Sequence, residues 1–410
     1  MRGVIGPRSL RGYACTAAAV AAGAFGGIAA LPAVAGADGP GVGTPAVVTL
    51  GDSAISGEAG RWAGNTNGSS GNIDALGSTA YWDTPTGEAI RNCHRSRSAQ
   101  AYIGGGVLSV NLACSGARTT TGGTGSGEDY KPGIDFYSDA QGRRGQALAL
   151  QEYASTHNVK AVVVMIVANN YGFADVVTRC VTNWLTSPSW WKNYCSDDSD
   201  IADRFTPARQ ATETANVRDA ILRVAQAMRN AGYTTAQYKI IGQTYWNPIP
   251  RSDRARYPET GWDRQNIGGC GAWNRDVNWA NDVVVPAMNN SVRNGTAAAG
   301  LPNTTVLDLQ TAFDGRRLCE NTVGLLEERG IANWRSAGAV DNTEWVNQIR
   351  TVTTIVGPYQ LQESIHANYW GQMAMRNCLR QAYNGGAVRG GTCAHGTGLN
   401  GQGEPNMTLR

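Results

Sequence analysis

Short apolar runs rich in β-branched residues alternate with helical segments along most of the chain. The expected strands cover residues 46–50, 107–112, 160–168, 237–243 and 304–308. The expected helices cover residues 95–102, 144–156, 208–231, 276–294, 343–352 and 368–384. Such alternation is typical of a mostly parallel β-sheet with helices on both faces. Because neither a repeat period nor a linker interrupts the pattern, we expect residues 36–410 to form a single domain.

The N-terminal segment has the composition of a secretory signal peptide. Three arginines precede a small-residue apolar stretch, which ends in the Ala-x-Ala cleavage pattern Ala33-Val34-Ala35. An uncleaved membrane anchor is the alternative interpretation, but the stretch is too short and too rich in alanine for a stable span. We therefore assign residues 1–35 to a signal peptide and expect a secreted, extracellular protein.

The charge of the chain argues against nucleic acid as a partner. The formal net charge of +3 equals the contribution of the three arginines in the signal segment, so the mature chain is close to neutral and lacks a basic surface. No later stretch is apolar enough to span a bilayer, so we expect no stable membrane insertion. Gly396, Gly398 and Gly401 form a nominal nucleotide-binding pattern, but we expect no strand before them and no helix after them.

Eight cysteines follow the signal segment, and none of them belongs to a paired Cys-x-x-Cys motif. In an exported chain, an even set of this kind indicates disulfides and no zinc or other metal site. The sequence alone does not determine the connectivity. Closeness along the chain suggests the pairs Cys93–Cys114, Cys180–Cys195, Cys270–Cys319 and Cys378–Cys393.

Long insertions mostly follow the expected strands, so they should gather over the carboxyl edge of the sheet. They cover residues 54–92, 172–207, 244–275 and 309–362 and contain Trp62, Trp82, Trp184, Trp190, Trp191, Trp246, Trp262 and Trp334. Walls of aromatic side chains hold acyl chains or stack on sugar rings. The alternative, which we favour for any single tryptophan, is that large loops need small cores of their own.

The first expected strand ends at a candidate nucleophile. The apolar run 46–50 stops at Gly51-Asp52-Ser53. Gly51 permits a sharp turn, and Ser53 would open a helix whose free N–H groups face a developing anion. We therefore take Ser53 as the candidate nucleophile. Gly-Asp-Ser is also a common turn sequence. Whether Ser53 is catalytic or only part of a turn therefore depends on whether suitable partner residues occur elsewhere in the chain.

Partners of the required types stand elsewhere in the chain. Gly116 and Asn169 follow the expected strands 107–112 and 160–168, so they should meet Ser53 at one edge of the sheet. The backbone N–H groups of Ser53 and Gly116, with the side-chain amide of Asn169, would form an oxyanion hole. His366 would act as the general base. Glu363, three residues earlier, would hold the imidazole in the right tautomer.

Each of these residues also has a structural interpretation. Asn169 is able to serve as a turn former, and Gly116 is able to serve as a packing residue beside a disulfide. The remaining histidines lie in contexts that we interpret as solvated or helix-capping; they are His94, His157 and His395.

Taken together and in order, these blocks resemble the SGNH, or GDSL, hydrolase family, in particular the secreted lipases and esterases of actinomycetes. The resemblance rests on Gly51-Asp52-Ser53, on Ala113-Cys114-Ser115-Gly116-Ala117, on Asn169-Asn170 and on His366 before the last helix. It implies a three-layer α/β/α fold of the flavodoxin-like type, no cofactor, and Ser53, Gly116, Asn169 and His366 as functional positions. It also implies a Cys93–Cys114 pair beside Gly116.

The sequence departs from the family pattern in two blocks. Asn170 stands where the family commonly has aspartate, so it cannot supply a negative charge. Glu363 and Ala367 stand where aspartate and proline are usual. Because glutamate has one more methylene than aspartate, a main-chain carbonyl such as that of Ser364 is the alternative partner of His366.

We therefore expect a secreted, monomeric serine hydrolase that cleaves acyl or lipid esters through an acyl-enzyme, without a cofactor. Its partner would be a small-molecule or lipid ester. A carbohydrate deacetylase or an acyltransferase using the same site is the first alternative. An inactive binding module of the same fold is the second.

Overall fold

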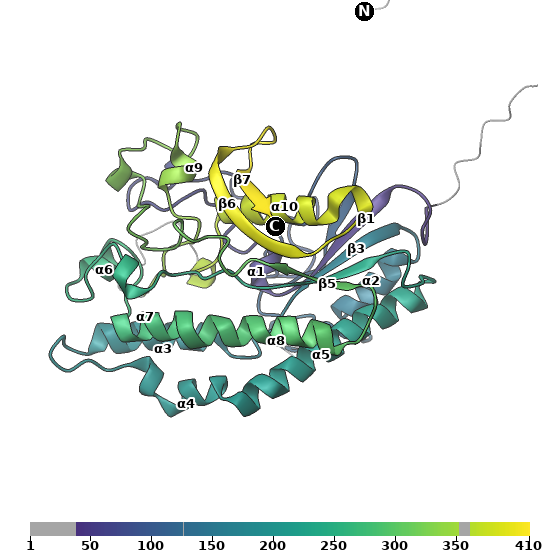
Figure 1. Cartoon of the computed structure of the whole chain (residues 1–410), viewed down its shortest axis with the longest axis horizontal. Coiled ribbons are helices and arrows are strands. Elements are labelled where there is room, and N and C mark those ends of the chain that lie inside the picture. The colour runs from purple at the N-terminus through teal and green to yellow at the C-terminus, as the bar shows by residue number, and fades with distance from the viewer. Residues whose placement is uncertain (1–37, 126, 352–360) are drawn as a thin grey trace, which may run out of the picture. The chain divides into compact units, whose positions relative to one another are not determined.

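The structure is a computed structural model that describes residues 38–125, 127–351 and 361–410 (Figure 1). The expected signal peptide, residues 1–35, lies outside the described residues. Seven strands of the described part form one sheet in the order β2-β1-β3-β4-β5-β6-β7. They are β1 (Pro45–Gly51), β2 (Leu108–Asn111), β3 (Asn158–Met165), β4 (Lys239–Gln243), β5 (Thr304–Asp308), β6 (Gly391–Leu399) and β7 (Pro405–Leu409).

The sheet is parallel except at one edge, where β7 pairs with β6 in the antiparallel sense. All five expected strands are present, and the mostly parallel sheet predicted from the sequence is confirmed. The order 2-1-3-4-5 of the first five strands is that of flavodoxin-like sheets, which have their switch point between the first and third strands. Ligands of such sheets bind in the crevice at this point, beside the carboxyl end of β1.

The centre of the core consists of β1 and β3. Residues 46–51 of β1 are all buried, and β3 is buried apart from Lys160. A strand covered on both faces needs apolar side chains on both, which explains why these strands read as continuous apolar runs without alternation.

Helices cover both faces of the sheet. Helices α5 and α8 pack together on one face, and α10 lies on the other beside β6 and β7 (Figure 1). Within the described residues, no helix combines the length and the apolar character needed to cross a membrane. The helices are α1 (Ser53–Ser56), α2 (Gln146–Ala154), α3 (Phe173–Thr186), α4 (Ser199–Ala202), α5 (Pro207–Asn230), α6 (Asp263–Asn266), α7 (Asn274–Trp279), α8 (Val285–Ala298), α9 (Ala339–Asn342) and α10 (Tyr369–Tyr383).

Four of the six expected helices are present, because α2, α5, α7 with α8, and α10 cover their positions. The helix expected at 95–102 is wrong, since this segment forms turns. There Arg95 bonds the carbonyls of Leu112 and Ala113, and Ser98 bonds that of Gly60, so side chains tie the segment to other loops.

The helix expected at 343–352 is also wrong over its described residues, 343–351. Its backbone N–H groups donate to distant carbonyls: Trp345 to Arg316, Asn347 to His366 and Ile349 to Gly269. Long-range hydrogen bonds of this kind replace the i to i−4 bonds of a helix. Residue 352 lies outside the described residues.

Sequence reasoning missed helix α3, strands β6 and β7, and the four-residue helices α4, α6 and α9. Helix α3 lies inside the segment taken as an insertion, although apolar residues recur every fourth position from Phe173 to Leu185. Strands β6 and β7 form from the glycine-rich C-terminal segment, so the expectation of no strand around Gly396 is wrong. Their pairing with β5 and with each other overrides a composition that disfavours strands.

The four disulfides join the nearest cysteines along the chain, as predicted. Cys93–Cys114 ties the end of one insertion to the loop that follows β2, and Cys180–Cys195 ties α3 to the segment after it. These two disulfides thus tie down segments that follow strands β2 and β3.

Candidate active site

A rigid turn at the end of β1 positions Ser53. Gly51 has φ of +143°, and a side chain there would overlap the carbonyl oxygen of Met165. The side-chain amide of Gln146 accepts from the N–H of Gly51 at 2.7 Å and donates to its carbonyl at 2.9 Å. The turn therefore requires glycine and is held by hydrogen bonds on both sides, so Ser53 enters α1 in a defined orientation.

Asp52 caps the short helix that Ser53 opens. Its Oδ1 accepts from the N–H of Ala54 at 3.1 Å, and its Oδ2 accepts from the hydroxyl of Tyr245 at 2.5 Å. Burial raises the pKa of Asp52 to about 6, although the hydrogen bonds from Tyr245 and Ala54 work in the opposite direction. This carboxyl group is therefore a structural anchor that binds the turn after β1 to the loop after β4.

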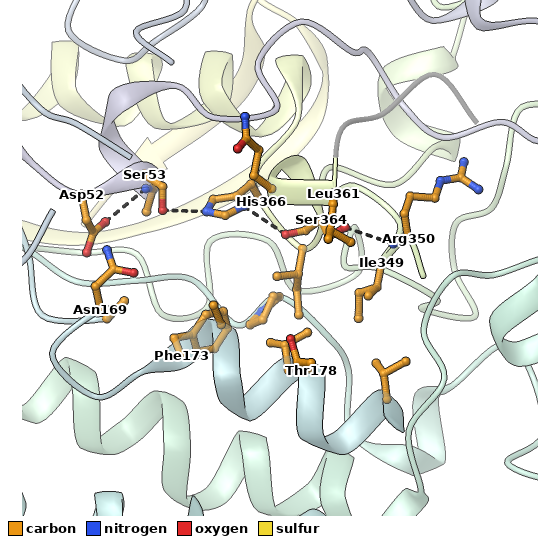
Figure 2. Close-up of a pocket in the computed structure, with 18 of the residues that line it drawn as sticks. Asp52, Ser53, Asn169, Phe173, Thr178, Ile349, Arg350, Leu361, Ser364 and His366 are labelled. Carbon is orange, nitrogen blue, oxygen red and sulfur yellow. Dashed lines mark hydrogen bonds between the residues drawn. The ribbon is translucent and has the colours of Figure 1, made fainter. Parts of the chain in front are cut away.

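The hydroxyl of Ser53 lies against the imidazole of His366. Its Oγ is 2.7 Å from Nε2 of His366, and Nδ1 of the same ring is 3.0 Å from the carbonyl oxygen of Ser364 (Figure 2). Burial lowers the pKa of His366, so the ring is neutral near pH 7. A neutral ring with Nδ1–H donated to a carbonyl has its lone pair at Nε2, facing Ser53.

Glu363 does not occupy the position expected from the sequence. Its buried carboxylate accepts from Nε1 of Trp62 at 3.0 Å and from the hydroxyl of Tyr81. The carbonyl of Ser364 takes the place at Nδ1 of His366 that was expected for Glu363. The contact at Nδ1 of His366 is therefore the one given as the alternative from the sequence, a main-chain carbonyl. Glu363 instead holds the segment that carries Ser364.

The loops after β2 and β3 approach the same edge of the sheet. Asn169 lines the pocket beside Ser53 and donates through Nδ2 to the carbonyl of Ala117 at 2.8 Å. Gly116 precedes Ala117 and has φ of +82°. Cys114, on its other side, donates its N–H to Gly51 at 3.1 Å. The backbone around Gly116 is thus bound to both the β1 turn and Asn169.

Two β-branched residues beside the site have positive φ angles. Val167, just before the Asn169 loop, has φ of +133°, and Ile365, just before His366, has φ of +60°. These conformations cost free energy for a β-branched residue, and they recur where the surrounding structure holds functional groups in place.

A largely apolar cavity of about 560 Å³ opens beside Ser53 and His366 (Figure 2). One wall is a stripe of α3 that runs from Phe173 to Leu185, and the opposite wall comes from segments 349–351 and 361–366. At about 1.5 Å per residue, this stripe of the helix is roughly 18 Å long. Its apolar lining includes Phe173, Ala174, Val177, Val181, Leu185, Trp246, Pro248, Met288, Ile349, Leu361 and Ile365.

The other histidines have structural partners. His94, expected to be solvated or capping, is in fact buried, and its Nδ1 lies 2.7 Å from Glu58. His157 bonds the carbonyl of Tyr153 at the end of α2. His395 lies in β6, where its ring meets Trp345 edge-on.

One group of potential metal ligands occurs among the described residues, formed by Cys180, Cys195 and Asp276. The two sulfur atoms are joined in a disulfide, and the carboxylate accepts from the N–H groups of Cys195 and Ser196. This group is therefore explained by a disulfide and a loop anchor.

Several residues that support the site were missed from the sequence. Gln146 and Tyr245 bind the residues before Ser53, and Trp62 and Tyr81 bind Glu363. Tyr245 follows the end of β4 by two residues, a position that signals the carboxyl edge of the sheet. The other three lack a sequence signal because their partners are far away along the chain.

No protein-family model matches the sequence, and no curated protein matches it. An extracellular lipase from Streptomyces rimosus is 17% identical, with 83% of this chain and 100% of that chain covered and a TM-score of 0.43. A phospholipase A1 from Streptomyces albidoflavus NA297 is 17% identical, covering 83% and 99% respectively, with a TM-score of 0.41. An aryl esterase from M. smegmatis is 12% identical, covering 72% and 97%, with a TM-score of 0.26.

Proposed function

We propose that this chain is a serine hydrolase that cleaves carboxylic esters through an acyl-enzyme. The observation that carries the proposal is the 2.7 Å contact between Oγ of Ser53 and Nε2 of His366 at the wall of an apolar cavity. A hydroxyl in contact with a neutral, oriented imidazole is the arrangement that activates a serine nucleophile.

In the first half of the reaction, Oγ of Ser53 attacks the ester carbonyl while its proton passes to Nε2 of His366. The Nδ1–H of the resulting imidazolium donates to the carbonyl of Ser364, which preserves the ring orientation. His366 then gives the proton to the leaving alcohol. In the second half, a water molecule attacks the acyl carbonyl while its proton passes to His366; the bond between the acyl carbon and Oγ of Ser53 then breaks, Oγ takes the proton back from His366, and the acid is released.

The oxyanion of each tetrahedral intermediate would be bound by the N–H groups of Ser53 and Gly116 and by the side chain of Asn169. The amide nitrogen of Asn169 carries two hydrogens. One is donated to Ala117, and in this proposal the other serves the oxyanion. Losing one such donor typically costs about 3 kcal/mol of transition-state stabilisation.

The lining of the cavity favours an acyl chain as the acid part of the substrate. Apolar side chains of α3 continue from the reacting serine to Leu185, and each buried methylene contributes about 0.8 kcal/mol. A lipid or other long-chain ester suits this lining better than an acetylated sugar, whose acetyl group would leave most of the apolar wall unused.

The proposal extends to family and location. The four blocks around Ser53, Gly116, Asn169 and His366 support membership of the SGNH hydrolases. The four disulfides support secretion, with residues 1–35 as the signal peptide, since such bonds persist in oxidising compartments.

A chromogenic ester series from acetyl to palmitoyl tests the proposal. We expect turnover that increases with chain length and disappears in Ser53→Ala, whereas the matched control Ser155→Ala, in the exposed turn after α2, retains it. No turnover at any chain length, or undiminished turnover by Ser53→Ala, would reject the proposal. A preference for acetyl esters would instead favour the deacetylase.

A further inference from the structure

A buried carboxylate lies behind the candidate catalytic pair and has no part in the steps above. Glu58 follows α1, and its N–H donates to the carbonyl of Ser53 at 3.3 Å. Its side chain is fully buried, with Oε1 2.7 Å from Nδ1 of His94. Its Oε2 has no hydrogen-bond partner within residues 38–125, 127–351 and 361–410. The charge of Glu58 is therefore only partly balanced by direct contacts.

His94 connects Glu58 to the segment that carries His366. Its ring stacks on Tyr81, with centroids 4.5 Å apart, and the hydroxyl of Tyr81 donates to Glu363. The side-chain amide of Gln362 is 3.0 Å from Nε2 of His94. The cluster of Glu58, His94, Tyr81 and Glu363 is thus linked, through Gln362 and Glu363, to the segment that carries Ser364 and His366.

The two protonation states of His94 have different partners for Nε2. In the neutral ring, Nδ1–H donates to Glu58 and Nε2 accepts from Gln362. In the charged ring, Nε2–H faces the carboxylate of Glu88, whose Oε1 lies 3.6 Å away. Burial by itself lowers the pKa of His94, but Glu58, Glu88 and Glu363 raise it overall. Both states therefore have a partner in place.

In the proposed reaction, a nearby negative charge would stabilise the positively charged form of His366. When His366 takes the proton of Ser53, a buried imidazolium forms, and its Nδ1–H meets a neutral carbonyl instead of a carboxylate. Burial lowers the pKa of His366; among the surrounding charges Glu58 raises it and His94 lowers it. Glu58 and His94 thus act on the imidazolium with opposite signs.

We propose that Glu58 is a positioning residue whose buried charge stabilises the imidazolium of His366, and that the protonation of His94 sets how much of that charge acts on His366. This inference rests on the proposed function, because it concerns the proton transfer from Ser53. Neither residue touches the substrate. Glu58 would thus supply the negative charge near His366 that the sequence predicted for Glu363, without contacting the imidazole directly.

The test compares Glu58→Gln and His94→Gln with the wild type. The readouts are the pH dependence of Ser53 phosphonylation by a p-nitrophenyl phosphonate, and kcat and KM for the best ester. We expect Glu58→Gln to lower the apparent pKa of His366 and to reduce kcat by about tenfold at similar KM, which corresponds to about 1.4 kcal/mol. We expect His94→Gln, which keeps a donor for Glu58 but loses the positive charge, to raise this apparent pKa.

The matched control is Glu152→Gln, which removes the same charge from an exposed position on α2 and should leave both readouts unchanged. Opposite shifts in the two cluster variants support the inference, since a loss of packing would not change sign with charge. Shifts of the same sign, or no shifts in variants that melt like the wild type, overturn it.

The same experiment separates this inference from the proposed function. If the wild type reacts with neither the phosphonate nor the ester, both the proposed hydrolase function and this inference are wrong. If the wild type reacts but the apparent pKa of His366 is the same in both variants as in the wild type, only this inference is wrong. Should Glu58→Gln fail to fold, His94→Gln decides alone, because an unchanged or lowered pKa in that variant contradicts the role given to its charge.

Discussion

The hydroxyl of Tyr245 donates a 2.5 Å hydrogen bond to the carboxylate of Asp52, the residue directly before Ser53. The bond joins the loop after β4 to the turn after β1, and both partners are buried. It shows that the position of Ser53 depends on a carboxyl group that is costly to ionise, since burial raises the pKa of Asp52 to about 6. The stability of the site should therefore depend on pH.

Asp52→Asn should change the pH dependence of stability. The native protein keeps the proton of Asp52 up to about pH 6, whereas the unfolded chain loses it near 3.8. Between these values unfolding releases a proton, so the contribution of this group to stability is largest below pH 4 and is lost as pH rises through 6. The loss amounts to at most about 3 kcal/mol.

Denaturant titrations at pH 4 and pH 8 measure this effect. The stability of Asp52→Asn relative to the wild type should be higher at pH 8 than at pH 4, and the control Asp219→Asn, at a partly exposed position, should show no such difference. An equal effect of Asp52→Asn at both pH values would contradict a raised pKa.

Glu363→Gln should affect stability more than catalysis. Because the carbonyl of Ser364 faces Nδ1 of His366, the variant should keep kcat within about tenfold of the wild type. Glutamine has only one side-chain oxygen, whereas the carboxylate accepts hydrogen bonds from both Trp62 and Tyr81. One buried donor would lose its partner, so we expect a loss of about 1–3 kcal/mol in the free energy of unfolding. A loss of kcat comparable to that of Ser53→Ala would restore Glu363 as the acid of a triad.

Thr178→Trp should shorten the acyl chains that the protein accepts. Thr178 lines the cavity from α3, and an indole there would displace several methylenes of a long acyl chain (Figure 2). At about 0.8 kcal/mol per methylene, palmitoyl esters should lose tenfold or more in kcat/KM while acetyl esters keep most of theirs.

The matched control for this variant is Thr186→Trp, in the last turn of the same helix and outside the lining of the cavity. It should leave the chain-length profile unchanged. Equal losses for acetyl and palmitoyl esters in Thr178→Trp would show that the cavity does not hold the acyl chain.

Replacing both Cys93 and Cys114 by serine should lower stability and activity together. The disulfide spans 21 residues, and loss of such a cross-link costs about 3 kcal/mol. Because Cys114 also donates to Gly51 and lies two residues before Gly116, the proposed oxyanion donor at Gly116 should become less well positioned and kcat should fall.

Replacing Cys378 and Cys393 in the same way is the control. This pair spans 15 residues, joins α10 to β6, and should therefore cost similar stability with little change in kcat. Melting curves and kcat at a temperature where all variants are folded measure both effects. Equal kcat in the two double variants would contradict the proposed role of Gly116 as an oxyanion donor.

The sequence alone determined the features that depend on neighbours along the chain. The five parallel strands follow from β-branched apolar runs, and the turn at Gly51 follows from local backbone sterics. The disulfide pairs agree with the pairing that closeness in sequence suggested, although the sequence left the connectivity open. The expected contact between Ser53 and His366 is present, with Ser53 after the carboxyl end of β1 and His366 in the segment before α10.

The pairing of the buried polar groups depended on how the loops pack in three dimensions. Glu363 meets Trp62 and Tyr81 instead of His366, and residues 343–351 lose their expected helix to backbone bonds from distant loops. His94 is buried against Glu58, although its local context suggested a solvated ring. A buried polar group must find a partner, and which partner lies within 3 Å depends on how the loops pack, which no local pattern encodes.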